Sequence, residues 1–168
     1  MKRQRLNWQE KVKKNVRKIM DFEHVKAVFE EYLNGYDREN DKVKLKIVHT
    51  YGVIRCSEEI GRRMGLQAED MELAKLIALL HDIGRFEQFN SFEADTMDHA
   101  TYGVKVLFEE GMIRQFIEED TWDDVIRTAI AKHSDYELTG ITDERTLLHA
   151  RLIRDADKLD NCRVKLEA

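Results

Sequence analysis

The chain has 168 residues, 42% apolar and 36% charged, with a formal net charge of −5 and two cysteines. This composition excludes a disordered chain and a disulfide scaffold, and we expect free thiols in a reducing compartment, with the cytoplasm as the default. No apolar run reaches the roughly 18 residues of a membrane-spanning helix, so we expect one globular domain without a membrane partner.

The N-terminal region is basic and amphipathic. Residues 1–18 contain eight lysines and arginines but only one acid, Glu10. Spaced apolar residues predict helix from about residue 6 to residue 33, with a break near Asp21 and a stop at Asn34-Gly35. We expect residues 1–40 to form basic amphipathic helices packed on a core of residues 41–168. Nucleic acid is not the expected partner, because a solvated helix face is the commoner reason for such a charge pattern.

Two long helices are predicted in the first half of the core. One runs from Asp41, its predicted cap, to Met64, and Gly65 ends it. The next runs from about Ala68 to Asp82 and is apolar on every side near its end, which is typical of a central helix. The apolar stripe of the first helix follows steps of three and four residues: Leu45, His49, Gly52, Val53, Cys56, Ile60 and Met64.

The helical pattern lapses between Gly84 and Asp98. Gly84 is expected to lie just past the end of the preceding helix. A segment of about fifteen residues without a regular pattern is often functional in a compact domain. We therefore predict a lid over a neighbouring site.

Three further helices are predicted towards the C-terminus, over residues 98–110, 121–133 and from about 142 onwards. His99 lies on the inner stripe of the first of them and His133 on that of the second. The chain reaches Ala168 without a helix stop signal, as expected for a fragment of something longer. Together these patterns predict an all-α fold, a single irregular bundle of about six to eight helices.

Histidines recur on the inner faces of these predicted helices. One histidine on an apolar face is usually a core residue bonded to a backbone carbonyl. Four such histidines, together with Asp82 and a late acid, instead indicate a catalytic metal centre, because imidazole and carboxylate together suit divalent cations. His24 and His149 lie among charged neighbours and are expected to be solvated. The four inner histidines are His49, His81, His99 and His133.

A histidine on one helix, a His-Asp pair closing an apolar helix and Ala-Asp-Lys on a late helix form an ordered set. The set is His49, His81-Asp82 and Ala156-Asp157-Lys158, and the pair is followed by Ile83-Gly84-Arg85. This order resembles the HD-domain superfamily of metal-dependent phosphohydrolases over residues 41–161. His99, opening a helix, and His133, ending one, look like the extra histidines of the two-metal branch of that superfamily.

The resemblance implies a ligand set for two divalent cations, whose identity could be Fe, Mn, Mg, Ni or Zn. One cation would be bound by His49, His81, Asp82 and Asp157. The second would be bound by His99 and His133, with Asp82 bridging the pair. Asp157 is favoured over Asp155 because the family's ligand follows an alanine and precedes a basic residue, whereas helical phase does not distinguish the two.

Two basic residues of the chain lie beside proposed ligands. Arg85 and Lys158 could hold the phosphate of a substrate, or each could form a salt bridge to the neighbouring acids. We expect catalytic roles for Asp82, Arg85 and Lys158.

The resemblance implies hydrolysis of a phosphomonoester, phosphodiester or pyrophosphate in a nucleotide or another small phosphorylated metabolite, through a metal-bound hydroxide. One alternative keeps the same ligands for a di-iron oxygenase acting on a small polyol or phosphonate. Another is a ligand-sensing module without turnover, which is disfavoured because the chain retains all six ligands. The sequence does not predict an oligomeric state.

Overall fold

The computed structural model describes residues 20–90 and 96–167, and all of the regular secondary structure in these ranges is helical. This confirms the all-α prediction. Within the same ranges, every helix is too short or too polar to cross a lipid bilayer. The helices are α2 (Phe22–Leu33), α3 (Asp41–Met64), α4 (Ala68–Leu80), α5 (Ile83–Asn90), α7 (His99–Val104), the π-helix η1 (Lys105–Glu109), α8 (Ile113–Phe116), α9 (Asp123–Lys132) and α10 (Glu144–Glu167).

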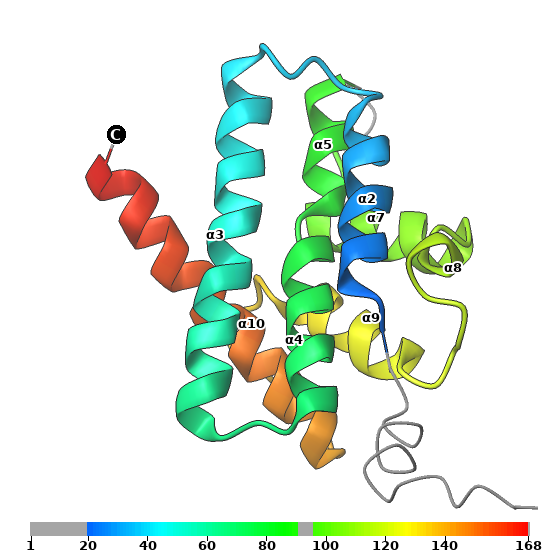
Figure 1. The fold of residues 1–168 in the computed structure, drawn as a ribbon, viewed down its shortest axis with the longest axis vertical. Helices are drawn as coiled ribbons and strands as arrows, with labels where there is room; N and C mark the ends of the chain where they lie inside the picture. Colours follow the sequence, from blue (N-terminus) through cyan, green and yellow to red (C-terminus); the bar gives the residue numbers. More distant parts are fainter. Residues whose placement is uncertain (1–19, 91–95, 168) are drawn as a thin grey trace, which may run out of the picture.

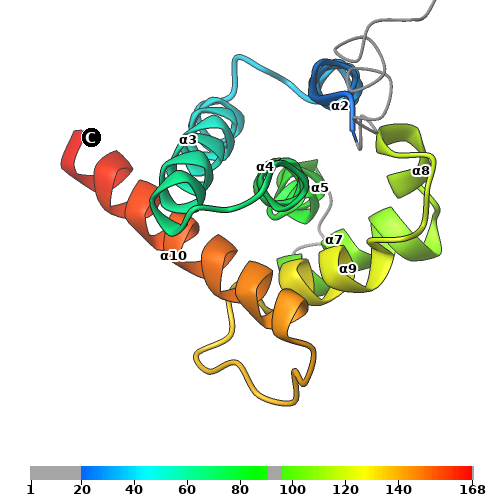
Figure 2. The same ribbon diagram turned by 60° about the horizontal axis from the view of Figure 1, so that its bottom comes forward.

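The helices surround a central pair formed by α4 and α5. Figure 2 shows this pair nearly end on, with α2, α3, α10, α9 and α8 arranged around it. Helices α3 and α4 run side by side in opposite directions, and the C-terminal end of α10 projects away from the rest of the bundle (Figure 1). The closest packing partners of α10 are α3 and α9.

Helix α4 is the core helix that the sequence predicts. Its last five residues, Leu76 to Leu80, are all buried, so no face of this part of the helix meets solvent. Burying such side chains contributes roughly 1.5–3 kcal/mol for each large aliphatic residue. Because His81 and Asp82 directly follow Leu80, their side chains emerge in the interior of the bundle.

Helix α2 covers one side of this core. Asp21 caps its N-terminus, accepting hydrogen bonds from the backbone N–H groups of Glu23 and His24. Val25, Phe29 and Leu33 recur on one face and are buried. The basic residues 1–19 lie outside the described ranges, so the expected packing of the whole region 1–40 remains a prediction.

The segment expected to be a lid is largely helical. Residues 83–90 form α5, and Phe86 is buried in the core. Gly84 does not end a helix but lies within α5. A Cβ at this position would overlap the backbone oxygen of His99, so the close contact between the two segments requires a glycine here. The lid prediction is therefore wrong for residues 84–90. Residues 91–95 lie outside the described ranges.

Smaller differences concern α3 and the region before α9. Asn40, rather than Asp41, caps α3 through its side chain. Leu45 and Met64, predicted on the inner stripe, are each 53% exposed, so the buried stripe is shorter than the apolar pattern indicates. The sequence did not predict the short helix α8.

Candidate metal centre

The six predicted ligands converge from five helices. His49 lies on α3, His81 and Asp82 follow α4, and Asp157 lies on α10. His99 is the first residue of α7, and His133 directly follows α9. All of these residues except Asp157 are buried, and Asp157 is half-buried. The ligand atoms fall into two groups, each within 4.8 Å, and Asp82 belongs to both.

The first group consists of His49, His81, Asp82 and Asp157. Nε2 of His49 lies 2.9 Å from Oδ1 of Asp157 and 3.6 Å from Oδ2 of Asp82. Nε2 of His81 lies 3.3 Å and 3.4 Å from the same two oxygens. Two imidazole nitrogens and two carboxylate oxygens thus face one another across a space of a few ångströms.

The second group consists of Asp82, His99 and His133. Nε2 of each histidine lies 3.4 Å from Oδ1 of Asp82, and the two Nε2 atoms are 3.0 Å apart. Asp82 therefore turns Oδ2 towards the first group and Oδ1 towards the second. This is the arrangement that a carboxylate bridging two cations requires.

Backbone carbonyls orient two of the histidines. Nδ1 of His81 lies 2.6 Å from the carbonyl oxygen of Ala78, and Nδ1 of His133 lies 2.7 Å from that of Ile130. Both histidines directly follow the last residue of a helix, where carbonyls are free of helical partners. With Nδ1–H donating to these oxygens, Nε2 of each ring is left to bind a cation.

The donor set suits divalent cations. Nε2 of His81 is buried and has no hydrogen-bond partner among residues 20–90 and 96–167, which is costly unless a ligand satisfies it. The adjacent Nε2 atoms of His99 and His133 need a proton or a cation between them, because two lone pairs at 3.0 Å repel. Imidazole nitrogens with carboxylate oxygens are typical of Zn²⁺, Fe²⁺ and Mn²⁺ sites, so the residues present fit two such cations.

The pKa values of histidines in the two ligand groups are shifted in opposite directions. Burial lowers the pKa of His81, but the carboxylates of Asp82 and Asp157 outweigh it and raise that pKa to about 10. Burial is the largest effect at His99 and lowers its pKa to about 4, with a further contribution from His133. Burial opposes ionisation of Asp82, yet His81 and the other neighbouring donors hold its pKa well below the usual value. The carboxylate of Asp82 is thus ionised.

Two residues beside the ligands were not singled out from the sequence. Nζ of Lys46 lies 2.7 Å from Oδ2 of Asp82. Oδ2 of Asp160 lies 2.8 Å from Nδ1 of His49. A spacing of three residues could have identified both, since Lys46 precedes His49 and Asp160 follows Asp157 by one helical turn.

The structure separates the acids of α10. Asp155 is exposed, whereas Asp157 faces His49 and His81. Lys158 is exposed, and its side chain has no ion pair within the described ranges. The geometry therefore brings Asp157 into the centre but does not bring Lys158 towards the neighbouring acids.

Arg85 lies at an opening beside the second ligand group. Its side chain is half-buried, and Nη1 donates to Oε1 of Gln88 at 3.1 Å. Together with His99 and the exposed Ser134 it lines an open cavity of about 430 Å³. The salt bridge to Asp82 that the sequence left open does not form, so the guanidinium remains available at this opening.

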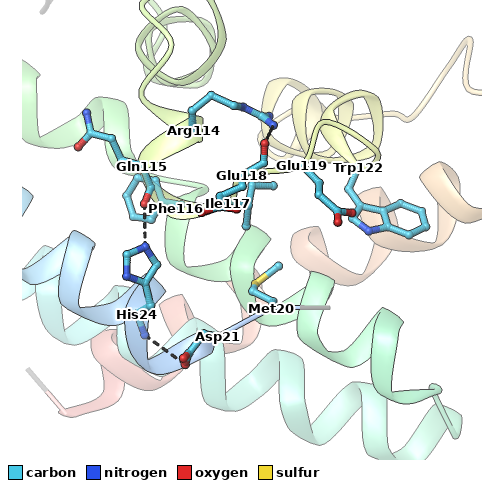
Figure 3. Close-up of a pocket in the computed structure, with 10 residues that line it drawn as sticks. All are labelled: Met20, Asp21, His24, Arg114, Gln115, Phe116, Ile117, Glu118, Glu119 and Trp122. Carbon is cyan, nitrogen blue, oxygen red and sulfur yellow. Dashed lines mark hydrogen bonds between the residues drawn. The ribbon is translucent and has the colours of Figure 1, made fainter. Parts of the chain in front are cut away.

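The two histidines outside the centre differ from each other. His24 is exposed, as predicted, and its Nε2 lies 3.0 Å from the carbonyl oxygen of Gln115, in a separate pocket between α2 and the residues around α8 (Figure 3). The prediction for His149 is wrong: it is 1% exposed, and its Nε2 lies 2.9 Å from Oδ1 of Asp70. Arg145, a charged neighbour one helical turn earlier on α10, donates to the same Asp70 oxygen instead of marking a solvated face.

Curated relatives cover most of this chain. The sequence is 30% identical over 162 residues to Ribonuclease Y of Acetivibrio thermocellus, an alignment covering 92% of this chain and 27% of the relative. It is 29% identical over 136 residues to Ribonuclease Y of Alkaliphilus metalliredigens, covering 76% of this chain and 26% of that protein. The chain thus spans about a quarter of the length of these relatives.

A solved structure and a family model agree on the fold. An HD superfamily hydrolase from an uncultured Thermotogales bacterium matches with a TM-score of 0.53 and 24% identity, covering 92% of this chain and 74% of that one. The family model for the HD domain matches residues 47–162, which include all six predicted ligands. The chain belongs to the HD-domain family.

Proposed function

We propose that this protein is a metal-dependent phosphohydrolase that cleaves a phosphoester or phosphoanhydride in a nucleotide or another small phosphorylated metabolite. The observation that carries the proposal is the orientation of Asp82, whose two oxygens face two different groups of buried ligands. Membership of the HD-domain family supports hydrolase chemistry in general. The substrate class within that chemistry is our inference.

The residues divide the work between cation binding and substrate binding. His49, His81 and Asp157 would hold one cation, His99 and His133 would hold the other, and Asp82 would bridge them. When bound, a pair of divalent cations supplies an activated water and neutralises charge on the attacked phosphate. Arg85 would donate hydrogen bonds to a non-bridging phosphate oxygen from the cavity that it lines with His99.

An RNA phosphodiester is the second candidate substrate. Similarity to proteins named Ribonuclease Y over 92% of this chain favours it over an arbitrary phosphodiester. The cavity at Arg85 is open to solvent, and Ser134 and Met97 in its lining are exposed. Because the cavity is open, it is compatible with either a small nucleotide or an RNA strand. A short oligoribonucleotide therefore belongs in the first substrate panel.

The test is release of product by protein reconstituted with Mn²⁺. The panel contains nucleoside mono-, di- and triphosphates, bis-(p-nitrophenyl) phosphate and an oligoribonucleotide. We expect turnover with at least one substrate, loss of at least a hundredfold in Asp82→Asn, and unchanged rates in the control His24→Ala, whose side chain is exposed away from the centre.

Two outcomes would contradict the proposal. Consumption of dioxygen with a polyol or phosphonate by the iron-loaded protein, without phosphate chemistry, would favour the oxygenase alternative. Binding of a nucleotide without turnover across the whole panel would favour a sensing module.

A further inference from the structure

Asp160 is a buried acid that does not belong to either ligand group. Its side chain is 1% exposed, and it lies on α10 one turn beyond Asp157. A carboxylate is rarely buried this completely unless hydrogen bonds satisfy it. The hydrogen bonds of Asp160 therefore indicate what it does.

Each oxygen of Asp160 has a different partner. Oδ2 lies 2.8 Å from Nδ1 of His49, and Oδ1 accepts a hydrogen bond of 2.8 Å from Nε of Arg163. The other ring nitrogen of His49, Nε2, faces Asp157 and Asp82. The ring thus connects the buried acid on one side with the proposed first cation site on the other.

Gly52 provides the space for this acid. It lies on α3 one turn beyond His49, and a Cβ at this position would overlap Oδ1, Cγ and Oδ2 of Asp160. Any side chain at Gly52 would therefore displace the carboxylate from His49.

The position of His49 explains why a side-chain acceptor is needed. His81 and His133 each follow the end of a helix, and the carbonyl three residues earlier accepts their Nδ1–H. His49 instead lies in the middle of α3, where backbone carbonyls already accept hydrogen bonds from the helix. An acceptor for its Nδ1 must come from another element, and Asp160 on α10 is that acceptor.

We propose that Asp160 is a positioning residue, which accepts the Nδ1–H hydrogen bond of His49 and thereby holds Nε2 as the ligand of the first cation. Gly52 makes room for the carboxylate, and Arg163 orients it from the opposite side. The inference rests on the proposed two-cation centre. It adds that this centre depends on a residue that touches neither cation.

The test compares Mn²⁺ binding by the wild-type chain of 168 residues, Asp160→Asn and a matched control, Asp155→Asn, which makes the same change at an exposed position on the same helix. Isothermal titration calorimetry of the metal-free proteins reports both sites. We expect one of the two sites to weaken by 10- to 100-fold in Asp160→Asn, with the other unchanged and with wild-type behaviour in Asp155→Asn. Equal affinities in all three proteins would overturn the positioning role.

A spectroscopic signature separates positioning from general stability. In Zn²⁺-loaded wild type, ¹H–¹⁵N spectra should show a downfield, slowly exchanging proton on Nδ1 of His49. This signal should be lost in Asp160→Asn while the Nδ1 signals of His81 and His133 persist. A wild-type spectrum in which Nδ1 of His49 carries no proton would overturn the proposal even if Asp160→Asn failed to fold.

Gly52→Ala provides a second route, because it displaces the carboxylate without changing its charge. It should weaken the same site as Asp160→Asn, and wild-type affinity in a folded Gly52→Ala protein would count against the proposal. Wild-type protein that binds two Mn²⁺ ions yet hydrolyses no phosphate would contradict the proposed function alone. The binding comparison would remain valid in that case, so the two failures are distinguishable.

Discussion

At the scale of single residues, Asp82 has the most contacts with other charged and imidazole groups of the centre. One oxygen faces His81 and Lys46, and the other faces His99 and His133. Removing its charge should therefore affect both cation sites, whereas removing a histidine of the second group should affect only one.

We predict that Asp82→Asn lowers the metal content of the reconstituted protein at both sites and abolishes turnover. His99→Ala or His133→Ala should reduce the metal content from two ions per chain to one. Inductively coupled plasma mass spectrometry of protein equilibrated with Mn²⁺ measures the ratio. Two ions per chain in His99→Ala would show that the assignment of the second group is wrong.

Lys46 supplies a positive charge next to the carboxylate of Asp82. Its Nζ is 2.7 Å from Oδ2 of Asp82, and its side chain is only 20% exposed. A cation bound to the same oxygen would be repelled by this ammonium, since charges a few ångströms apart interact strongly in a partly buried site.

Lys46→Met should consequently bind Mn²⁺ more tightly than wild type, by roughly 3- to 10-fold, because a repulsion of about 1 kcal/mol is removed. Lys42→Met, on the same helix but exposed, is the control and should bind as wild type does. Titration calorimetry at low ionic strength measures the difference. Weaker binding in Lys46→Met would mean that the lysine supports the ligands instead.

At the scale of helices, the contact between α5 and α7 places the second ligand group. Gly84 on α5 faces Gly103 on α7, and the missing side chain of Gly84 lets the two helices approach closely. Because α7 begins at His99, the approach also sets the distance from His99 to Asp82.

We predict that Gly84→Ala decreases the free energy of unfolding by about 1–3 kcal/mol and weakens the second cation site, because the added Cβ overlaps the His99 backbone. Gly103→Ala is the matched control. Its Cβ would have neighbours no closer than 3.5 Å, so this change should leave stability unchanged or raise it by up to about 1 kcal/mol through helix propensity. Urea denaturation compares the two variants. Equal destabilisation would contradict the role of the close contact.

At the scale of the whole molecule, a buried histidine joins distant parts of the bundle. His149 near the start of α10 contacts Asp70 on the first turn of α4, and Arg145 donates to the same oxygen. Burial is the largest influence on His149 and lowers its pKa below the usual value of 6.5. In the folded protein His149 thus binds its proton at a lower pH than in the unfolded chain.

The sign of the pH dependence follows from this difference. Between the lowered folded pKa and about 6.5, the unfolded chain binds more protons at His149, so acidification favours unfolding. The stabilisation of the folded state by neutral His149 is fully present above pH 6.5 and is lost as the pH falls through the lowered pKa. Between pH 7.5 and 5.5, the free energy of unfolding should therefore fall less in His149→Gln than in wild type. The two slopes should differ by at most about 1.4 kcal/mol per pH unit. Urea denaturation of the metal-free proteins at several pH values measures this, and parallel pH profiles would contradict it.

Much of the helical architecture could be predicted from local patterns. The bounds of α3 and α4 follow from apolar periodicity and the glycine stop at Gly65, whose φ of 70° lies in the left-handed region. The helix α5 could not be predicted in the same way, because Gly84 imitates a stop signal. The glycine at position 84 is instead required by the close contact with α7, and a contact between two helices cannot be inferred from the local sequence.

At the candidate site, too, some residues could be predicted from the sequence and others could not. The family resemblance pointed to the six proposed ligands, and all six converge in the structure. It did not point to Lys46 and Asp160, whose significance depends on Asp82 and His49 across the helix contacts. His149 was expected to be solvated from its charged sequence neighbours, although its partner Asp70 lies 79 residues earlier in the chain.

The helical fold and the HD-type ligand pattern could both be predicted from the amino-acid sequence, because they depend on residue types and on spacings within a few helical turns. Three features became visible only in the folded structure: which oxygen of Asp82 faces which histidines, the contact of Asp160 with His49, and the burial of His149. These features depend on how helices pack against one another, and packing brings together residues that local periodicity treats as independent.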